Sequence, residues 1–531
     1  LQKSYSGKVK LIYIDPPYNT GNDFIYPDKY SESLDTYLAY AGLIDDEGKK
    51  FSTNTPNEGR FHTKWLNMMY PRLYLARNLL SEDGVIFISI DDNEQANLKA
   101  LCDQIFGENC FVADAIWRSK DNSNNDAKKF SLDHNHTLIY GKNDYWQPEK
   151  LSDEKKQGHF RNPDNDSLGP YFDGNPVNSP NYRENLIYDL ISPNGTVIKP
   201  PKNGWRWSKD IMQEKIDSGE IRFTDDQTGI RRRTYLKDMK GLPPSTLWID
   251  LERTGHNRQA KYELMKLMSE DYYDTPKPVK LISYIIKLAA SDKNSIVLDF
   301  FSGSCSTAQA VIEENAQDGG NRKFVMIQLP EPCSQDSIAY RDGFQTVSEI
   351  GKERIRRVIK KFAKENKYEN NEVTLPGMEE DTPELDLGFR VLKLNQSNFK
   401  IWDGTNPDTP EDELTKQLEL HIDHIDSNAS QEDILFELLL KAGFKPTENI
   451  EKRELTGKTV FSISGGALLI CLEDEISPEL IDAVAEAEPL QLICLDRRFQ
   501  GNDQHKANTV QTFAARTLGR EKAEQIVFRT V

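Results

Sequence analysis

The stretch Val9–Gly21 reads VKLIYIDPPYNTG, and the rest of the chain is interpreted around it. Its apolar run Leu11–Ile14 is dense enough for a parallel strand that is buried on both faces. Asp15–Tyr18 follows, and its two prolines cannot continue a central strand, so the chain must turn there. Ligands of open α/β sheets bind at the carboxyl ends of the strands. The stretch therefore predicts a site at this turn. Because the chain starts at Leu1, just before the strand, we also expect further residues ahead of it.

The turn offers three groups that suit a planar ring with an exocyclic amino group. The carboxylate of Asp15 can accept a hydrogen bond, and carbonyls beside Pro16 and Pro17 can accept others without a competing N–H. The ring of Tyr18 provides a flat face on which a base can stack. These groups fit an extruded adenine or cytosine. An ordinary strand-ending turn remains the alternative, because Asp and Pro are common turn residues.

Segments of helical and strand periodicity alternate on both sides of a central interval, which predicts a doubly wound α/β sheet. The expected strands are 85–90, 115–117, 137–140, 295–299 and 323–329, and the expected helices are 65–80, Asp92 or Asn93 to Ile105, 279–290 and 306–314. The polar segment Asp23–Thr63 is expected to be a long loop with a short helix near Ser33–Ala41, either a mobile lid or a solvated insertion.

Composition indicates a globular protein whose acidity is concentrated at one end. The net charge is −18, but residues 371–531 hold 16 Lys and Arg against 31 Asp and Glu, so contact with DNA elsewhere is not excluded. No apolar run approaches the ~20 residues of a membrane span. The six cysteines lack CxxC spacing, which is typical of cytosolic thiols, so we expect a cytoplasmic protein. His134 and His136 could share a strand face, but no Cys or third His lies close by, so we expect no metal site.

The interval between about 145 and 270 is rich in Pro and Gly, and its aromatic residues are interleaved with cations. Residues 199–240 contain 11 Lys and Arg against 7 Asp and Glu. Basic side chains bind phosphates, and Arg can read guanine edges, although a solvated Arg run is the plain alternative. The candidate DNA-binding residues are Arg206, Lys209, Arg222, Arg231, Arg232, Arg233 and Lys237.

The segment Ser295–Ser304 predicts a strand, a tight glycine turn and a following helix. Gly303 would let the backbone approach a ligand closely, and the helix N-terminus would favour a negative group such as a carboxylate. Glu331, after the next strand, is well placed to hold ribose hydroxyls.

These motifs resemble those of the amino-group DNA methyltransferases. Asp15–Tyr18 resembles motif IV, (Asp/Asn/Ser)-Pro-Pro-(Tyr/Phe/Trp), in the Asp form of the adenine-modifying branch, and Ile14–Gly21 is similar to the Mod subunits of Type III restriction-modification systems. Asp299–Gly303 resembles motif I, Asp-x-Phe-x-Gly-x-Gly, with Cys305 in place of the second glycine. Lys277-Pro278 resembles motif X, and the order IV, variable interval, X, I is the β-class permutation.

The resemblance implies transfer of a methyl group from S-adenosylmethionine to N6 of a flipped adenine in double-stranded DNA, without a metal. It implies catalytic roles for Asp15, Pro16, Pro17 and Tyr18. The implied cofactor-binding residues are Thr275, Lys277, Asp299, Phe300, Phe301, Ser302, Gly303 and Glu331. It also implies a Rossmann-like methyltransferase sheet with an inserted target recognition domain and a small C-terminal α/β domain.

The expected domain organisation follows from this interpretation. Residues 1–145 form the catalytic half, 146–270 the target recognition domain, 271–365 the cofactor-binding half, 366–388 a linker and 389–531 an interaction domain. The implied partners are a second Mod copy and the ATP-dependent Res helicase-nuclease. A solitary DNA methyltransferase, a cytosine-modifying enzyme and a catalytically inactive DNA-recognition subunit are the alternatives.

Overall fold

A computed structural model describes residues 1–21, 61–151, 159–163, 165–166, 169–238, 241, 243–369, 386–394, 397–399, 425–426, 429–473, 475–499, 502–517 and 525–531. The predicted loop at 23–63 and its helix at 33–41 lie almost entirely outside these residues. The chain divides into two compact units. Unit 1 comprises Leu1–Trp146, Ile249–Ser283 and Asp292–Val531, and unit 2 comprises Gln147–Trp248 and Tyr284–Ser291.

The strand β1 (Val9–Ile14) runs through the middle of the main sheet of unit 1. It pairs in parallel with β2 (Leu80–Ile90) on one side and with β11 (Ile296–Asp299) on the other. Its residues from Leu11 to Ile14 are at most 1% exposed. The prediction of a parallel strand buried on both faces is therefore confirmed.

The sheet continues in both directions, in the order β3-β4-β2-β1-β11-β12. Here β12 (Lys323–Met326) is parallel to β11, whereas β4 (His134–Gly141) runs antiparallel to β2, and β3 (Phe111–Arg118) antiparallel to β4. The sheet is therefore mixed. The parallel strands β2, β1, β11 and β12 end at one edge, where the segment Asp15–Tyr18 follows β1.

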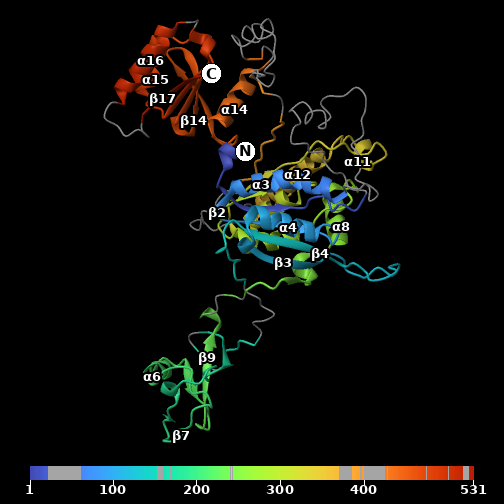
Figure 1. Ribbon diagram of the computed structural model, residues 1–531, viewed down its shortest axis with the longest axis vertical. Coiled ribbons are helices and arrows are strands. Elements are labelled where there is room, and N and C mark those ends of the chain that lie inside the picture. The colour runs from blue at the N-terminus through green and yellow to red at the C-terminus, as the bar shows by residue number, and fades with distance from the viewer. Residues whose placement is uncertain are drawn as a thin grey trace. The chain divides into compact units, whose positions relative to one another are not determined.

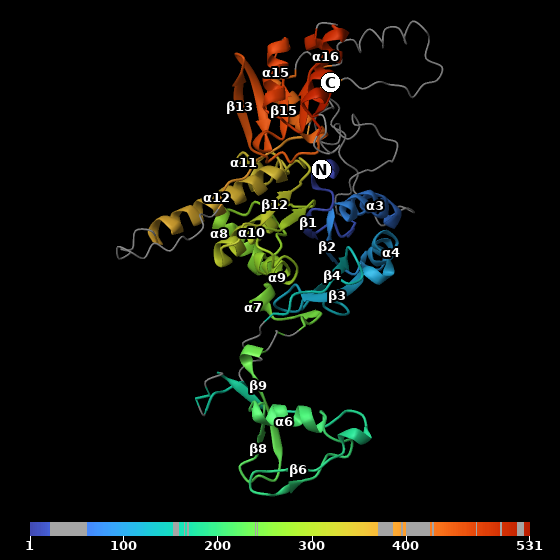
Figure 2. The same cartoon turned by 90° about the vertical axis from the view of Figure 1, so that its left-hand side faces the viewer.

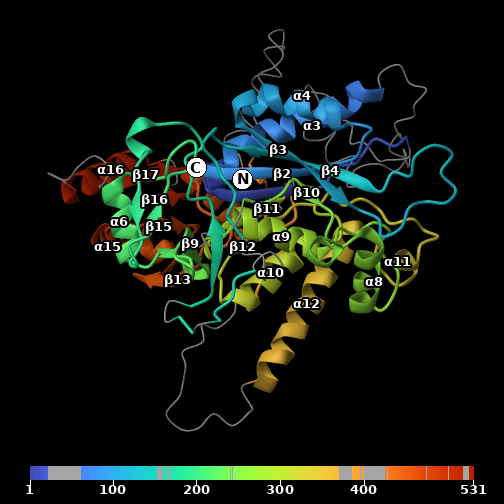
Figure 3. The same cartoon turned by 90° about the horizontal axis from the view of Figure 1, so that it is seen from below.

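Helices cover both faces of this sheet, as the doubly wound prediction requires. Figure 3 shows α3 (Phe61–Leu79) and α4 (Gln95–Phe106) on one side, and α10 (Ser306–Asp318) and α12 (Val347–Glu369) on the other. The expected cap of α4 was wrong, because Glu94 rather than Asp92 or Asn93 occupies the N-cap position. The further helices are α1 (Gln2–Tyr5), α7 (Leu251–Thr254), α8 (Asn257–Met268), α9 (Val279–Ala289) and α11 (Ile338–Arg341).

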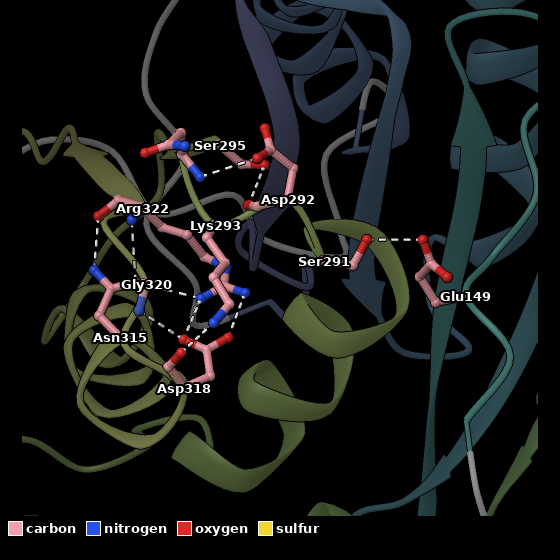
Figure 4. Close-up of polar contacts among 10 residues, drawn as sticks. Glu149, Ser291, Asp292, Lys293, Ser295, Asn315, Asp318, Gly320 and Arg322 are labelled. Carbon is pink, nitrogen blue, oxygen red and sulfur yellow. Dashed lines mark hydrogen bonds and ion pairs between the residues drawn. The ribbon is translucent and has the colours of Figure 1, made fainter. Parts of the chain in front are cut away.

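A polar cluster fixes the connection from α10 to β12. The guanidinium of Arg322 donates from Nη1 and Nη2 to the carboxylate oxygens of Asp318 at 3.0 and 2.8 Å (Figure 4). Asn315 donates to the carbonyl of Arg322 at 2.9 Å, and its own side-chain oxygen accepts from the Arg322 N–H at 3.1 Å. The side chain of Arg322 is 4% exposed, so this pairing compensates a buried charge. The cluster thereby sets where the strand after α10 begins.

Unit 2 has its own small core beside a three-stranded sheet. Figure 2 shows α6 (Lys209–Asp217) next to β8 (Ile221–Phe223) and β9 (Ile230–Tyr235). Trp205 and Met212 are at most 3% exposed in this core. The third strand of this sheet is β5 (Tyr171–Asn175), which pairs with β9, and the other strands of unit 2 are β6 (Leu190–Ile191), β7 (Val197–Ile198) and β10 (Leu247–Trp248).

The C-terminal part of the chain folds as a five-stranded sheet in the order β13-β14-β15-β16-β17, with helices on both faces (Figure 1). Along β15 (Leu468–Cys471), Leu468 and Ile470 pack in one core cluster with α14 residues, while Leu469 and Cys471 pack in another with α15 residues. This period of two is what a sheet between two helical layers requires. The other elements are α14 (Gln431–Lys441), β13 (Ile450–Leu455), β14 (Lys458–Ile463), α15 (Pro478–Glu486), β16 (Gln491–Cys494), α16 (Asp503–Arg516) and β17 (Val527–Thr530).

One expectation for this part was wrong, and one feature was not expected. The apolar segment Phe389–Leu394 is predicted from its sequence to be a strand, but these residues form none, and Val391, Leu392 and Leu394 are about half exposed or more. The hairpin of β13 and β14 was not expected, because four of the six residues of β13 are exposed and give no buried face to recognise. Among the described residues, no helix is both long and apolar enough to span a membrane.

Candidate active site

The predicted catalytic turn lies directly after β1, and its carboxylate contacts both Tyr18 and Lys277. The hydroxyl of Tyr18 donates to Asp15 Oδ1 at 2.8 Å, and Lys277 Nζ donates to Asp15 Oδ2 at 2.5 Å. Lys277 Nζ also lies 5.0 Å from the centroid of the Tyr18 ring. Burial and the nearby Asp15 raise the pKa of Tyr18 well above its usual value, so the hydroxyl keeps its proton and stays a donor. Residues 262 positions apart thus meet at one carboxylate.

The turn itself is held by groups that the sequence did not single out. Trp65 of α3 donates from Nε1 to the carbonyl of Pro17 at 2.7 Å. One residue beyond Tyr18, Asn19 adopts φ +59°, a left-handed conformation that Asn tolerates better than most residues. Its buried amide donates to Glu94, which is fully buried and also pairs with His62 at 2.6 Å. The N-cap position of α4 is thereby tied to the catalytic turn.

The predicted cofactor loop follows β11, next to β1 in the sheet. Asp299 accepts from the backbone N–H of Phe301 at 3.0 Å and from the hydroxyl of Thr307 at 2.6 Å. Burial is the largest influence on its carboxyl group and raises its pKa to about 7, although both hydrogen bonds act in the opposite direction. Asp15 raises this pKa further and Lys277 lowers it, which places Asp299 within electrostatic reach of the catalytic turn.

Two residues of the loop have left-handed backbones. Gly303 has φ +48°, a conformation that favours glycine, and a Cβ there would lie 2.7 Å from the hydroxyl of Tyr273, which would have to move to make room for it. Cys305 has φ +60° and ψ +39°, in the place where the motif I pattern has its second glycine. Non-glycine residues pay about 1–2 kcal/mol for this conformation. The backbone thus has the shape of the motif although the residue departs from it.

Helix α12 accommodates Cys305 by means of a glycine. A Cβ built on Gly351 would lie 2.6 Å from Cys305 Sγ and 3.1 Å from the carbonyl oxygen of Gly303. The side chain of Cys305 is 6% exposed and packs in a core cluster with Ile355 and Val358 of α12. The cysteine is therefore matched by the absence of a side chain at position 351.

Arg354 of the same helix holds the cofactor loop through hydrogen bonds. The segment Ser348–Phe362 is rich in Lys and Arg, a pattern that predicts a solvated or DNA-facing basic helix, but Arg354 is 2% exposed. Its Nη1 donates to the hydroxyls of Ser304 and Ser306 at 2.9 and 2.7 Å, and its Nε donates to Gln309 at 2.8 Å. Burial lowers the pKa of Arg354 to about 10, so the guanidinium is charged at neutral pH. Sequence periodicity could have placed it on the apolar face of the helix with Ile350 and Val358.

The other predicted cofactor residues surround this loop to different degrees. Ser302 is buried and donates to the carbonyl of Ile327 at 3.1 Å, while Phe300 and Phe301 are partly buried against the core. Glu331 follows β12, and its carbonyl accepts from the Val347 N–H at 2.9 Å. Thr275 is exposed two residues before Lys277. None of these contacts tests a role in cofactor binding, which stays a prediction.

The predicted DNA-binding residues belong to unit 2, and the structure separates them into two groups. Arg233 is 5% exposed and pairs with Asp166 at 2.8 Å, and Arg232 pairs with Glu220 at 2.7 Å. Arg222 also contacts Asp166, at 3.3 Å, but its side chain is 46% exposed. Arg233 therefore holds the small sheet together, and we withdraw it from the candidate DNA surface. The exposed candidates are Arg206, Lys209, Arg222, Arg231 and Lys237.

Comparison with known proteins identifies relatives of this chain. A family model described as DNA methylase matches residues 9–356, more than half of the chain. The Type III restriction-modification enzyme StyLTI Mod subunit of Salmonella typhimurium is 37% identical over 379 residues, which cover 70% of this chain and 57% of the relative. The EcoP15I Mod subunit of Escherichia coli is 34% identical over 401 residues, 67% of this chain and 61% of the relative.

A Type II enzyme is also similar. The methyltransferase M.KpnI of Klebsiella pneumoniae is 30% identical over 404 residues, which cover 70% of this chain and 87% of the relative. Among solved structures, PvuII DNA methyltransferase (cytosine-N4-specific) matches with a TM-score of 0.32 at 11% identity, over 67% of this chain and 89% of that chain. The chain thus spans about three fifths of the two Mod subunits, and the resemblance read from its motifs is confirmed. This chain belongs to the DNA methylase family.

Proposed function

We propose that the protein transfers a methyl group from S-adenosylmethionine to the N6 amino group of an adenine flipped out of double-stranded DNA. The observation that carries the proposal is the contact of Lys277 and Tyr18 with Asp15, which unites the motif IV turn with the motif X segment. The Asp form of motif IV favours adenine over cytosine. We place this reaction in the bacterial cytoplasm, where the DNA lies.

The residues of the turn would orient the amino group. Asp15 and the carbonyl of Pro16 would accept its two hydrogens, which disfavours delocalisation of the nitrogen lone pair into the ring and directs it at the methyl donor. The ring of Tyr18 would stack on the base, while its hydroxyl keeps Asp15 in one orientation. Pro17 would act through the turn, because its carbonyl is held by Trp65. As it becomes methylated, the nitrogen would lose one proton to Asp15 or water. Positioning of this kind supplies much of the rate of such a displacement.

The cofactor loop fits a ligand that carries an ammonium, a carboxylate and ribose hydroxyls. Gly303 offers backbone without a side chain, the N-terminus of α10 favours a carboxylate, and Asp299 and Glu331 offer acceptors to cationic or hydroxyl groups. Lys277, Ser302, Phe300, Phe301 and Thr275 complete the proposed cofactor set. S-adenosylmethionine supplies an electrophilic methyl group on a positively charged sulfur. Arg354 and Gly351 would keep the loop in shape without touching the ligand.

We further propose that unit 2 recognises the DNA sequence and that the C-terminal domain binds protein partners. The side chains that would contact phosphates or base edges are the exposed ones, Arg206, Lys209, Arg222, Arg231 and Lys237. Arg232 is only partly exposed and would contribute less. By analogy with the Mod relatives, the partners would be a second copy of the chain and the ATP-dependent Res helicase-nuclease. The similarity to M.KpnI over 87% of its length favours a second candidate, a methyltransferase that works without a nuclease. Co-purification of a helicase-nuclease with the tagged chain from its native host would favour the subunit with partners over the methyltransferase that works alone.

The reaction is tested by the identity of the product. The protein is incubated with S-adenosylmethionine carrying a labelled methyl group and unmethylated DNA, and the DNA is then digested to nucleosides. The proposal expects label in N6-methyladenine. Label in N4-methylcytosine would move the enzyme to the sister branch, and no label despite measurable cofactor binding would support an inactive DNA-recognition subunit.

A further inference from the structure

We propose that Asp92, His134 and His136 form a binding site for a divalent transition-metal ion of the Zn²⁺ type. Their candidate ligand atoms, one carboxylate oxygen and two imidazole nitrogens, all lie within 4.8 Å of one another. The site lies outside the catalytic turn, and none of its three residues is part of the proposed active site. The inference therefore stands independently of the proposed function.

Strand pairing brings the three residues together. His134 and His136 are two positions apart on β4, so their side chains share one face of the strand. Ile90, the last residue of β2, pairs with His136 in antiparallel register. The chain that leaves β2 therefore passes along the beginning of β4, and Asp92 reaches both histidines. The sequence showed only the two histidines, because the third ligand comes from a segment more than 40 positions earlier.

The distances suit a shared metal ion. Asp92 Oδ1 lies 3.1 Å from His136 Nε2 and 3.8 Å from His134 Nε2. Ligand atoms bonded at about 2.0–2.2 Å to a tetrahedral Zn²⁺ lie about 3.4 Å apart, so small adjustments of these side chains would complete the set. The ligands are two imidazoles and one carboxylate, a combination that favours Zn²⁺ and related ions over Mg²⁺ or Ca²⁺.

The second ring nitrogen of His136, Nδ1, contacts a carboxylate, as is usual for a histidine that binds a metal. Its Nδ1 lies 2.9 Å from Asp114 Oδ2, and Gln95 Nε2 donates to the same oxygen at 2.9 Å. A carboxylate on the other ring nitrogen would keep the proton on Nδ1 when an ion is bound, so that Nε2 would offer its lone pair to the ion in place of its hydrogen bond to Asp92. His136 is 13% exposed and Asp92 is 50% exposed, so the site is ordered on one side and open to ion entry on the other.

The proposed consequence is a cross-link at the sheet edge that carries the catalytic turn. The ion would connect the segment after β2 to β4, and through Asp114 to β3. Asp91, the neighbour of Asp92, acts electrostatically on Tyr18, so this segment forms part of the surroundings of the active site.

The test is metal binding by the full-length, untagged protein after removal of metals with a chelator. Co²⁺ is titrated in and followed by its visible absorption, and Zn²⁺ is then used to displace it. We expect one Co²⁺ per chain, and at least tenfold weaker binding in each of His134→Ala and His136→Ala. Asp114→Asn should weaken binding by about tenfold, the usual effect of altering a residue that supports a ligand.

His62→Ala is the matched control, because it removes an imidazole that pairs with Glu94 outside the cluster, and it should bind Co²⁺ like the unaltered protein. Circular dichroism in the absence of metal identifies any variant that has lost its fold. His134 is 36% exposed, so its replacement should leave the fold intact and keep the test decisive. The proposal is overturned if the unaltered protein binds no stoichiometric Co²⁺, or if the folded His134→Ala variant binds it equally well.

Discussion

The match between Cys305 and Gly351 leads to a prediction that can be worked out from the structure. In an unconstrained helix, Gly351→Ala should stabilise the protein by about 1 kcal/mol, because glycine is the poorer helix former. Here the added Cβ would lie 2.6 Å from Cys305 Sγ, a distance that requires a shift, and 3.1 Å from the carbonyl oxygen of Gly303. Overpacking of this kind costs about 1–3 kcal/mol. We therefore expect Gly351→Ala to displace the cofactor loop rather than to stabilise the helix.

The second substitution identifies the cause. Cys305→Gly removes the sulfur and suits the left-handed backbone at that position, so Gly351→Ala should be tolerated far better in this background. In calorimetric titrations with S-adenosylmethionine, we expect Gly351→Ala to weaken binding by about tenfold or more in the original chain, which is ~1.4 kcal/mol. In the Cys305→Gly chain its effect should fall below about threefold. Additive effects, with a coupling energy under ~0.5 kcal/mol, would refute the account of the loop.

Three further predictions concern other charged groups. The pKa of Asp299 is raised to about 7 from 3.8, so the stability that its protonated form contributes is fully present below pH 3.8 and is lost as the pH rises through about 7. The loss amounts to roughly 4 kcal/mol of unfolding free energy. Urea unfolding at several pH values should show this loss in the original chain and not in Asp299→Asn. Arg354→Met leaves the hydroxyls of Ser304 and Ser306 without the guanidinium that donates to them. The substitution should therefore lower the unfolding free energy by about 1–3 kcal/mol and weaken cofactor binding. Unchanged cofactor affinity would contradict the positioning role of Arg354. Arg231→Ala should weaken DNA binding and lower the slope of log K against log salt concentration by about 1, without altering stability. Arg233→Ala should instead destabilise unit 2 by ~2 kcal/mol, because it breaks the buried contact with Asp166. The reverse pattern would mean that the two arginines have been assigned the wrong roles.

Local patterns in the sequence were sufficient to predict the strands and helices that build the main sheet and its layers. The apolar run before Asp15 is the central strand, and the apolar face of 279–290 is buried as the helix α9. These predictions succeeded because burial on both faces or on one helical stripe leaves a periodic trace in the sequence. The strand expected at 389–394 failed because a short apolar segment does not by itself supply a neighbouring strand to pair with.

The parts of the site that depend on distant contacts could not be predicted. Glu94, Arg354 and Gly351 lie on helices, and nothing in their local sequence shows that they contact Asn19, Ser304 or Cys305. The same limit explains why Asp92 was not grouped with the two histidines of β4. The contact between Asp15 and Lys277 was not predicted either, although the family resemblance had assigned a catalytic role to the first residue and a cofactor-binding role to the second.

The central claim is that Asp15 acts on the amino group of the target base, in an active site completed by Lys277. The most direct test compares Asp15→Ala with the unaltered protein in single-turnover methyl transfer to unmethylated DNA, with DNA binding and S-adenosylmethionine binding measured on the same preparations. The account predicts that methyl transfer is lost while DNA binding is retained. Methyl transfer by Asp15→Ala at a rate close to that of the unaltered protein would contradict it.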